Sequence, residues 1–176
     1  GNLYSYRDMK AMVAVPAHVS TSGTTEIILA PEDVATLVVV AENEIVDRKL
    51  FKHLVKSERG ESTQEPCIQQ IQLSPDGATV SAVYTDATGR AEVLVFNNAI
   101  DNLYLRFDTK TKALPSQISF CGNEAICAYW SPDAVKDSEH HYMMDGRDDT
   151  SLLLLIDCFG VYANFTFDGS LYLAQE

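Results

Sequence analysis

The residues best suited to chemistry gather in one stretch of the chain, between positions 131 and 150. This stretch holds two adjacent histidines and six carboxylates: Asp133, Asp137, Glu139, His140, His141, Asp145, Asp148 and Asp149. Imidazole and carboxylate groups together can bind a divalent metal ion. Adjacent histidines on a loop point apart, however, and the spacing of the carboxylates fixes no coordination geometry. The pattern therefore favours a solvated acidic loop over a metal site.

The charge of the same stretch predicts how it behaves. Its six acidic residues against Lys136 and Arg147 leave positions 131–150 net negative by four, and few of its residues are apolar. Such a segment buries too little apolar surface to fold by itself. We expect a long, poorly ordered insertion whose deletion leaves folding and assembly unchanged. A docking arm for a basic partner is the alternative.

The remaining polar residues match no enzyme motif. The sequence has no Gly-x-Ser-x-Gly elbow, no phosphate-binding glycine-rich loop and no His-Glu-x-x-His. His18 and His53 are isolated, which is typical of surface or core residues. The sequence therefore predicts a protein that is not an enzyme, with no catalytic, metal-binding or cofactor-binding residue and no cofactor.

Two short motifs have structural explanations. Asp76-Gly77 and Asp168-Gly169 are pairs typical of tight turns between strands, and a calcium loop would need more oxygen ligands. Asn164 to Thr166 matches the glycosylation pattern but falls within an expected strand, so we discount it. Trp130 ends another expected strand, where a buried anchor is favoured over a peptide-binding hot spot.

The four cysteines follow no disulfide framework. Cys67, Cys121, Cys127 and Cys158 mostly fall within strand-like segments, and Cys121 and Cys127 lack the two-residue gap of a zinc or redox pair. We expect buried, reduced thiols in a cytosolic protein.

Composition excludes two classes of partner. The chain has 176 residues with a net charge of −12, from 13 basic and 25 acidic side chains. Nucleic acid and anionic lipid surfaces both attract clusters of Lys and Arg, so neither is an expected partner. No apolar run approaches the roughly 18 residues of a membrane span.

The strongest pattern in the chain is a repeated phrase. Alternating apolar residues, a turn and a β-branched run begin at Glu26, Gln70 and Gln117, and the third copy has lost the proline of the turn. A period of roughly 40–50 residues with several short strands is typical of β-propeller blades. We predict an all-β chain that forms part of a β-propeller, with about three blades of four antiparallel strands, near 24–66, 67–112 and 113–176. Because propellers close with 4–8 blades, we expect the rest of the propeller to lie outside this chain.

Turn residues and period-two alternation place the individual strands. We expect them at 11–17, 24–30, 34–41, 44–54, 68–73, 80–84, 91–96, 103–107, 118–120, 125–130, 152–156, 162–167 and 171–173. No helical periodicity persists for more than about two turns.

The C-terminal third carries a more specific signal. A Pro-x-Gln strand with a cysteine (113–121) leads to an apolar strand ending in Trp (124–130), then an aliphatic strand (152–157) and a Phe-Asp-Gly-x-x-Tyr-Leu segment (164–176). In this order the segments resemble the late N-terminal propeller of the vacuolar protein sorting-associated protein 16 family. The resemblance is best over 114–176 and fair back to Ile68. The chain departs from the family in its acidic insertion and lacks the start of the propeller and the helical half.

The resemblance implies a non-catalytic propeller scaffold in the HOPS and CORVET complexes. These complexes tether late endosomes and vacuoles or lysosomes and promote membrane fusion, so the implied location is cytoplasmic and peripheral on those membranes. The implied partners are other HOPS and CORVET subunits and a Sec/Munc-type SNARE chaperone, through parts of the protein outside this chain. No residue of the chain inherits a partner contact.

Two other functions stay open at this point. A generic WD-repeat-like adaptor would bind a protein partner, although the chain lacks the Gly-His and Trp-Asp signature of such blades. A propeller hydrolase or lyase would need His, Asp or Arg at the inner ends of strands, where this sequence is aliphatic.

Overall fold

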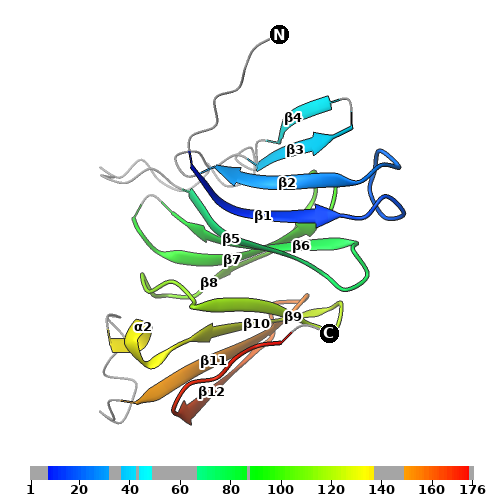
Figure 1. The fold of residues 1–176 in the computed structure, drawn as a ribbon. Helices are drawn as coiled ribbons and strands as arrows, with labels where there is room; N and C mark the ends of the chain where they lie inside the picture. The colour runs from blue at the N-terminus through cyan, green and yellow to red at the C-terminus, as the bar shows by residue number, and fades with distance from the viewer. Residues whose placement is uncertain are drawn as a thin grey trace.

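A computed structural model describes residues 8–31, 37–42, 44–48, 67–86, 88–136 and 149–174. Within these residues the chain forms three antiparallel sheets of four strands each (Figure 1), stacked side by side. The expected fold class, an all-β chain forming part of a β-propeller, is confirmed. We call the sheets blades 1, 2 and 3 in chain order.

Each blade is a simple meander in which neighbours in sequence are hydrogen-bonded neighbours in the sheet. Blade 1 contains β1 (Met9–Val15), β2 (Glu26–Pro31), β3 (Leu37–Ala41) and β4 (Glu44–Arg48). Blade 2 contains β5 (Cys67–Leu73), β6 (Thr79–Thr85), β7 (Ala91–Asn97) and β8 (Leu103–Asp108). Blade 3 contains β9 (Gln117–Cys121), β10 (Ala125–Trp130), β11 (Thr150–Asp157) and β12 (Tyr162–Asp168).

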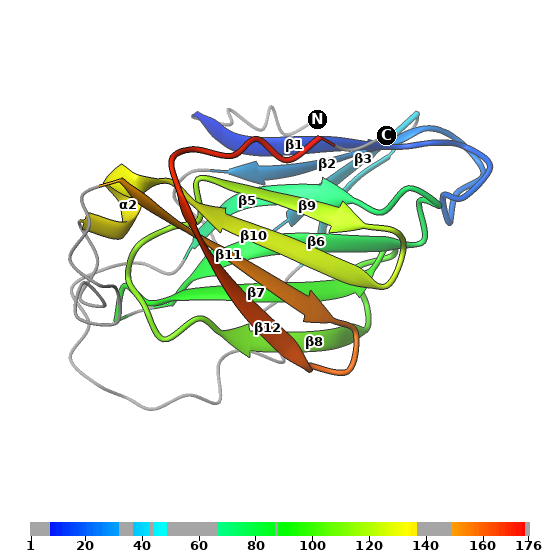
Figure 2. The ribbon, with the colours of Figure 1, turned by 90° about the horizontal axis from the view of Figure 1, so that it is seen from below.

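The first strand of each blade lies on the inner side of the stack. Strand β5 contacts both β1 and β9, whereas β4, β8 and β12 lie at the opposite, outer ends of their sheets (Figure 2). The alternation of side chains along each strand then gives every middle strand one face toward each neighbouring blade. Most residues of β12 are exposed.

Two apolar cores hold the blades together. The first joins blades 1 and 2 and includes Ile28, Leu37, Val80 and Phe96. The second joins blades 2 and 3: Val83, Val93 and Val95 of blade 2 pack against residues such as Ile118 and Ile156 of blade 3. Blade 2 is therefore covered on both faces, which explains its continuous burial along β6 and β7.

The repeated phrase does not mark the same structural position in all three blades. Gln70 and Gln117 both lie on inner strands, β5 and β9, whereas Glu26 begins β2, the second strand of its sheet. Blade 1 therefore begins at Met9, ahead of the start that the phrase placed near residue 24. The first copy resembles the second because β2, like β5, is an apolar strand with a proline at or just after its end.

Two other expected elements differ from the structure. The insertion at 131–150 starts with a short helix, α2 (Pro132–Lys136), and its 137–148 part lies outside the described residues. Ser131 caps α2, since its hydroxyl oxygen accepts the N–H of Ala134 at 3.4 Å, and Ala134 and Val135 pack against the second core. The strand expected at Leu171–Leu173 is instead an extended segment without ladder pairing. The expected strand at 34–41 is observed from Leu37 and that at 44–54 up to Arg48; their remaining residues lie outside the described ranges.

In the part of the chain that the structure describes, no helix is long and apolar enough to cross a membrane.

Candidate protein-interaction site

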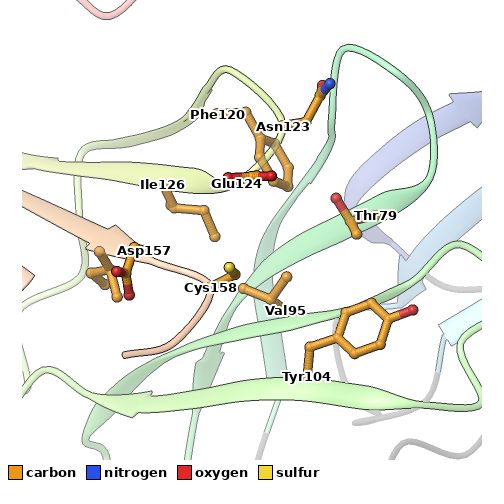
Figure 3. A pocket seen from close by; sticks show the side chains of 10 residues that line it. Thr79, Val95, Tyr104, Phe120, Asn123, Glu124, Ile126, Asp157 and Cys158 are labelled. Atoms are coloured by element: carbon orange, nitrogen blue, oxygen red, sulfur yellow. The ribbon is translucent and has the colours of Figure 1, made fainter. Parts of the chain in front are cut away.

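A cavity of about 290 Å³ opens between blades 2 and 3 (Figure 3). Its apolar wall comes from both blades: Val95 of β7, Phe120 of β9, Ile126 of β10 and Ile156 of β11. Its polar lining consists of Thr79, Tyr104, Asn123, Glu124, Asp157 and Cys158. A shallower hollow over Cys121, Gly122 and Phe159 adjoins it and shares four of these residues.

The β5–β6 turn forms one side of the cavity mouth, and its shape follows from its sequence. Ser74 donates its hydroxyl to Asp76 Oδ1 at 2.7 Å, and the Ala78 N–H donates to the same oxygen at 3.0 Å. These two hydrogen bonds lower the pKa of Asp76 below its ordinary value. The Asp76 N–H in turn donates to Asn123 Oδ1 at 3.1 Å, so the turns of blades 2 and 3 are tied together.

The β11–β12 turn forms the opposite side. Asp157 Oδ1 accepts the N–H groups of Phe159 at 2.9 Å and Val161 at 2.8 Å, so one oxygen of this carboxylate holds the turn. Gly160 has φ +83°, a conformation that residues with a Cβ rarely adopt. Phe159 is 86 % exposed at the tip of this turn. The turn thus presents an acidic group and an unburied aromatic ring beside the cavity.

One polar atom of the cavity lining lacks a partner. The hydroxyl oxygen of Thr79 is inaccessible to solvent and has no hydrogen-bond partner among the described residues. A buried hydroxyl without a partner costs about 1–3 kcal/mol.

The outward faces of the first and last blades are a second kind of candidate surface. On blade 3 this face carries Cys127, Leu153, Leu155 and Phe165, the last 46 % exposed. These residues alternate with the core residues of their strands, so they point away from blade 2. On blade 1 the corresponding outward face carries Met12, Ile27 and Ile45, which are 73 %, 39 % and 49 % exposed.

Part of the blade 3 face is covered by the chain itself. The Leu171 N–H donates to the Tyr129 hydroxyl at 3.0 Å, and this hydroxyl shares a hydrogen bond with Ser151 at 3.2 Å. Gln117 donates its amide to the Leu173 carbonyl and accepts the Leu173 N–H at 3.1 Å. The segment after β12 is therefore fastened across the sheet to the inner strand β9.

The cysteines are only partly as expected. All four are free, and Cys67 is buried, but Cys121 is exposed and Cys127 and Cys158 are half-buried. Cys121 lies at the end of β9, where the strand meets a turn, and strand alternation alone does not reveal that. Burial raises the pKa of the Cys127 thiol, and the neighbouring Cys121 raises it further.

Other residues singled out in the sequence are placed as follows. Trp130 is a buried anchor as predicted, 3 % exposed, with its Nε1–H donated to the Ala113 carbonyl at 2.9 Å. His18 lies in the β1–β2 loop, and His53 falls outside the described residues. Of the acidic and histidine cluster only Asp133 and Asp149 are described; the others are Asp137, Glu139, His140, His141, Asp145 and Asp148. Over the described ranges no group of three or more His, Cys, Asp or Glu side chains is placed to hold a metal ion.

The sequence does not predict this cavity, because its lining comes from six strands and two turns of two blades. The sequence feature that points to the cavity is the difference in length between corresponding loops of blades 1 and 2. Ten residues (16–25) join β1 to β2, whereas five (74–78) join β5 to β6.

Comparison with known proteins supports the fold. No protein-family model matches the sequence, and no curated protein matches it. Among solved structures, a chain of "Crystal Structure of Mitotic Checkpoint Complex" aligns with a TM-score of 0.50 and 10 % identity. The alignment covers 96 % of this chain but 46 % of that chain, so this chain spans less than half its length. At this identity the likeness concerns the fold alone, and the chain is part of a β-propeller.

Proposed function

We propose that the chain is a non-catalytic propeller scaffold that binds other proteins within a membrane-tethering complex. The observation that carries the protein-binding role is the set of apolar surfaces between and beside the blades. Soluble monomers rarely expose contiguous apolar patches unless these bind something. Met12, Ile45 and Phe165 are each close to half exposed or more, on the outward faces of two different blades.

The finer assignment rests on the resemblance of residues 114–176 to the vacuolar protein sorting-associated protein 16 family. This resemblance supports the proposal that the protein acts in the HOPS and CORVET complexes, peripheral on late endosome and vacuole or lysosome membranes. Other subunits of these complexes and a Sec/Munc-type SNARE chaperone are its proposed partners. The net charge of −12 is compatible with a protein that reaches membranes through such partners rather than by binding anionic lipid directly.

Co-purification tests this assignment. The affinity-tagged protein, expressed in its own cells, is expected to bring down tethering subunits and a Sec/Munc-type protein, identified by mass spectrometry. A matched bait carrying Trp130→Asp, which is expected to disrupt the second core, is the control and is expected to lose them. Purification of the folded protein without any of these partners contradicts the tethering assignment.

A generic adaptor propeller is the second candidate, and the cavity between blades 2 and 3 favours it. A propeller that presents a small apolar cavity beside carboxylates can recognise a short segment of a partner without belonging to a tethering complex. Co-purification of unrelated soluble proteins, with no tethering subunit among them, is the result expected for an adaptor.

A further inference from the structure

The two junctions between blades are filled differently at the rim that carries the β1–β2 loop. Between blades 1 and 2, Val19 of this loop packs against the first core. The Val19 Cγ2 atom comes so close to Gly77 that a Cβ added there would lie 2.5 Å away. Asn98 of the β7–β8 turn donates its amide to the Val19 carbonyl at 2.6 Å and to the Gly77 carbonyl at 3.0 Å. The Val19 side chain and the Val19 backbone carbonyl thus close this junction.

Strand register identifies the matching place between blades 2 and 3. Val80 pairs with Leu73 and Phe96 in blade 2 as Ile126 pairs with Phe120 and Ile156 in blade 3. The next turns also correspond, because the Ile100 N–H binds the Asn97 carbonyl as the Gly160 N–H binds the Asp157 carbonyl. Cys158 is therefore the counterpart of Asn98. The counterpart of the Val19 position is the cavity described above, which Cys158 lines.

Loop length explains why this second position is open. The β1–β2 loop of ten residues reaches over the neighbouring blade, whereas the β5–β6 turn of five residues closes on itself. The β5–β6 turn extends toward blade 3 only as far as Asn123, whose side-chain oxygen accepts the Asp76 N–H. Nothing among the described residues fills the space that Val19 occupies at the first junction, and a cavity of about 290 Å³ results.

The lining of the cavity indicates what completes it. Its floor is aliphatic and aromatic, formed by Val95, Phe120, Ile126 and Ile156. The charged side chains in its lining, Glu124 and Asp157, are both carboxylates, and one oxygen of Asp157 is free of the turn's hydrogen bonds. A segment with an aliphatic side chain beside a cation matches both features.

We propose that this junction is a binding site for an extended segment of a partner protein that inserts one aliphatic side chain, as Val19 does between blades 1 and 2, beside a Lys or Arg. The inserted side chain contacts Val95, Phe120 and Ile126, and the neighbouring cation lies against Glu124 and Asp157. The site deepens the proposed protein-binding role and rests on it. It does not depend on which complex the partner belongs to.

The probe is an acetylated, amidated hexapeptide, Gly-Ser-Lys-Leu-Ser-Gly, added to the complete chain at millimolar concentration. The readout is the alkylation rate of Cys158 by iodoacetamide, followed by peptide mapping. We expect at least a threefold slowing at Cys158. Cys127, on the outward face of blade 3, is the internal control and is expected to keep its rate. A peptide with Ser in place of Leu is expected to protect neither thiol.

Two variants test the chemistry of the site. Glu124→Gln is expected to weaken the lysine peptide two- to fivefold and to leave a peptide with Ser in place of Lys unchanged. Glu42→Gln, an exposed carboxylate of blade 1, is the matched control and is expected to change neither. Equal protection by the Leu and Ser peptides, equal slowing at Cys127, or no slowing at Cys158 overturns the proposal.

Failure of this site and failure of the tethering function are distinguishable. If tethering subunits co-purify with the chain but the peptide does not protect Cys158, the peptide site alone is refuted. Specific protection of Cys158 in a chain that brings down no tethering subunit supports the site and refutes the tethering assignment.

Discussion

Gly77 shows how one residue type is selected by its surroundings. Its φ is +72°, and Val19 leaves no room for a Cβ. Gly23 has the same φ of +72° but no atom within 4 Å of the place where a Cβ would be. The two glycines therefore separate the cost of backbone conformation from the cost of close packing.

Replacing Gly77 by Ala is expected to lower the free energy of unfolding by about 2–4 kcal/mol, because conformational strain and steric overlap add. Gly23→Ala is expected to cost only about 1–2 kcal/mol, since strain alone acts there. Urea unfolding of both variants measures the difference. Equal losses would show that Val19 moves aside freely and does not seal the first junction.

Glu92 and Arg106 form an ion pair whose carboxylate is buried. Arg106 donates Nε and Nη2 to the two oxygens of Glu92, each at 2.8 Å, and these hydrogen bonds raise the pKa of Arg106. The Glu92 side chain is 8 % exposed. Removing its partner would leave a buried carboxylate without a counter-charge.

We expect Arg106→Met to lower the free energy of unfolding by about 2–4 kcal/mol, because the buried Glu92 carboxylate loses its counter-charge. The partial exposure of Arg106 keeps this cost below that of a fully buried pair. Arg90→Met is the matched control: Arg90 and Asp108 are both exposed and 3.9 Å apart. That change is expected to cost about 0–1 kcal/mol. Thermal unfolding at neutral pH compares the two, and a control as costly as Arg106→Met would contradict the assignment.

Tyr84 lies beside the same pair and gives a pH-dependent signal. Burial, and then the negative charge of Glu92, raise its pKa from 10.0 to about 12. The folded state holds the phenolic proton more tightly than the unfolded state, so the stability it contributes is present below pH 10 and is lost as the pH rises from 10 to 12. The loss amounts to about 2–3 kcal/mol. Tyr84→Phe is expected to flatten this part of the stability profile, and an unchanged slope would refute the assignment.

At the scale of elements, Gln117 is the clearest link between segments far apart in sequence. It binds both backbone groups of Leu173 from the inner strand β9. Gln70 occupies the equivalent position on β5 and donates its amide to the Pro115 carbonyl at 2.7 Å. In both blades a glutamine of the inner strand therefore holds the segment that follows the outer strand.

Gln117→Ala is expected to release the segment at residues 171–174. Its Leu173 N–H loses its acceptor, so hydrogen exchange at this amide is expected to accelerate at least tenfold. Gln70→Ala is the control and is expected to leave the exchange of Leu173 unchanged. Slow exchange at Leu173 in Gln117→Ala would mean that the hydrogen bond of Leu171 to Tyr129 suffices to hold the segment.

Helix α2 illustrates which elements the sequence can predict. Ser131 at the cap, Pro132 in the first turn and an acidic Asp133 after it are ordinary helix-start signals. Five residues are too few to show helical periodicity. The acidic composition of the whole stretch therefore predicts a loop where the short helix lies. Val135 packs in the second core because tertiary contact, not propensity, stabilises so short a helix.

At the scale of the whole molecule, three blades leave two apolar faces without a neighbouring blade. In blade 2 the residues that face blade 3, such as Val83 and Val93, are fully buried. Leu153, the counterpart of Val93 on the outward face of blade 3, is only half-buried, and its strand neighbour Phe165 is exposed. Each Å² left in water costs roughly 25 cal/mol of stabilisation.

The isolated chain is therefore expected to self-associate or to bind a hydrophobic dye. Phe165→Asp and Met12→Asp, on opposite outward faces, are each expected to reduce both effects, whereas Leu114→Asp, an exposed apolar residue of the β8–β9 connection, is the control. Light scattering and dye fluorescence provide the measurements. A monodisperse monomer that melts cooperatively and binds no dye would contradict the expectation.

The sequence by itself determined the strands and the class of fold. Period-two alternation and the Ser-Pro-Asp-Gly turn act over a few neighbouring residues, so β5 to β8 were predicted nearly to their ends. The start of blade 1 at Met9 was missed because β2 happens to carry the same apolar phrase as β5 and β9. Local patterns cannot say which strand of a blade they belong to.

Tertiary structure alone decided where the surface is open. Val19 seals one junction between blades because its loop is long enough to reach the neighbouring blade, and the matching turn of blade 2 is too short to do so. Contacts of this kind join residues as distant as Val19 and Asn98, and no local pattern encodes them. The cavity lined by Val95, Glu124 and Cys158 exists only once blades 2 and 3 have packed together, because each blade supplies part of its wall.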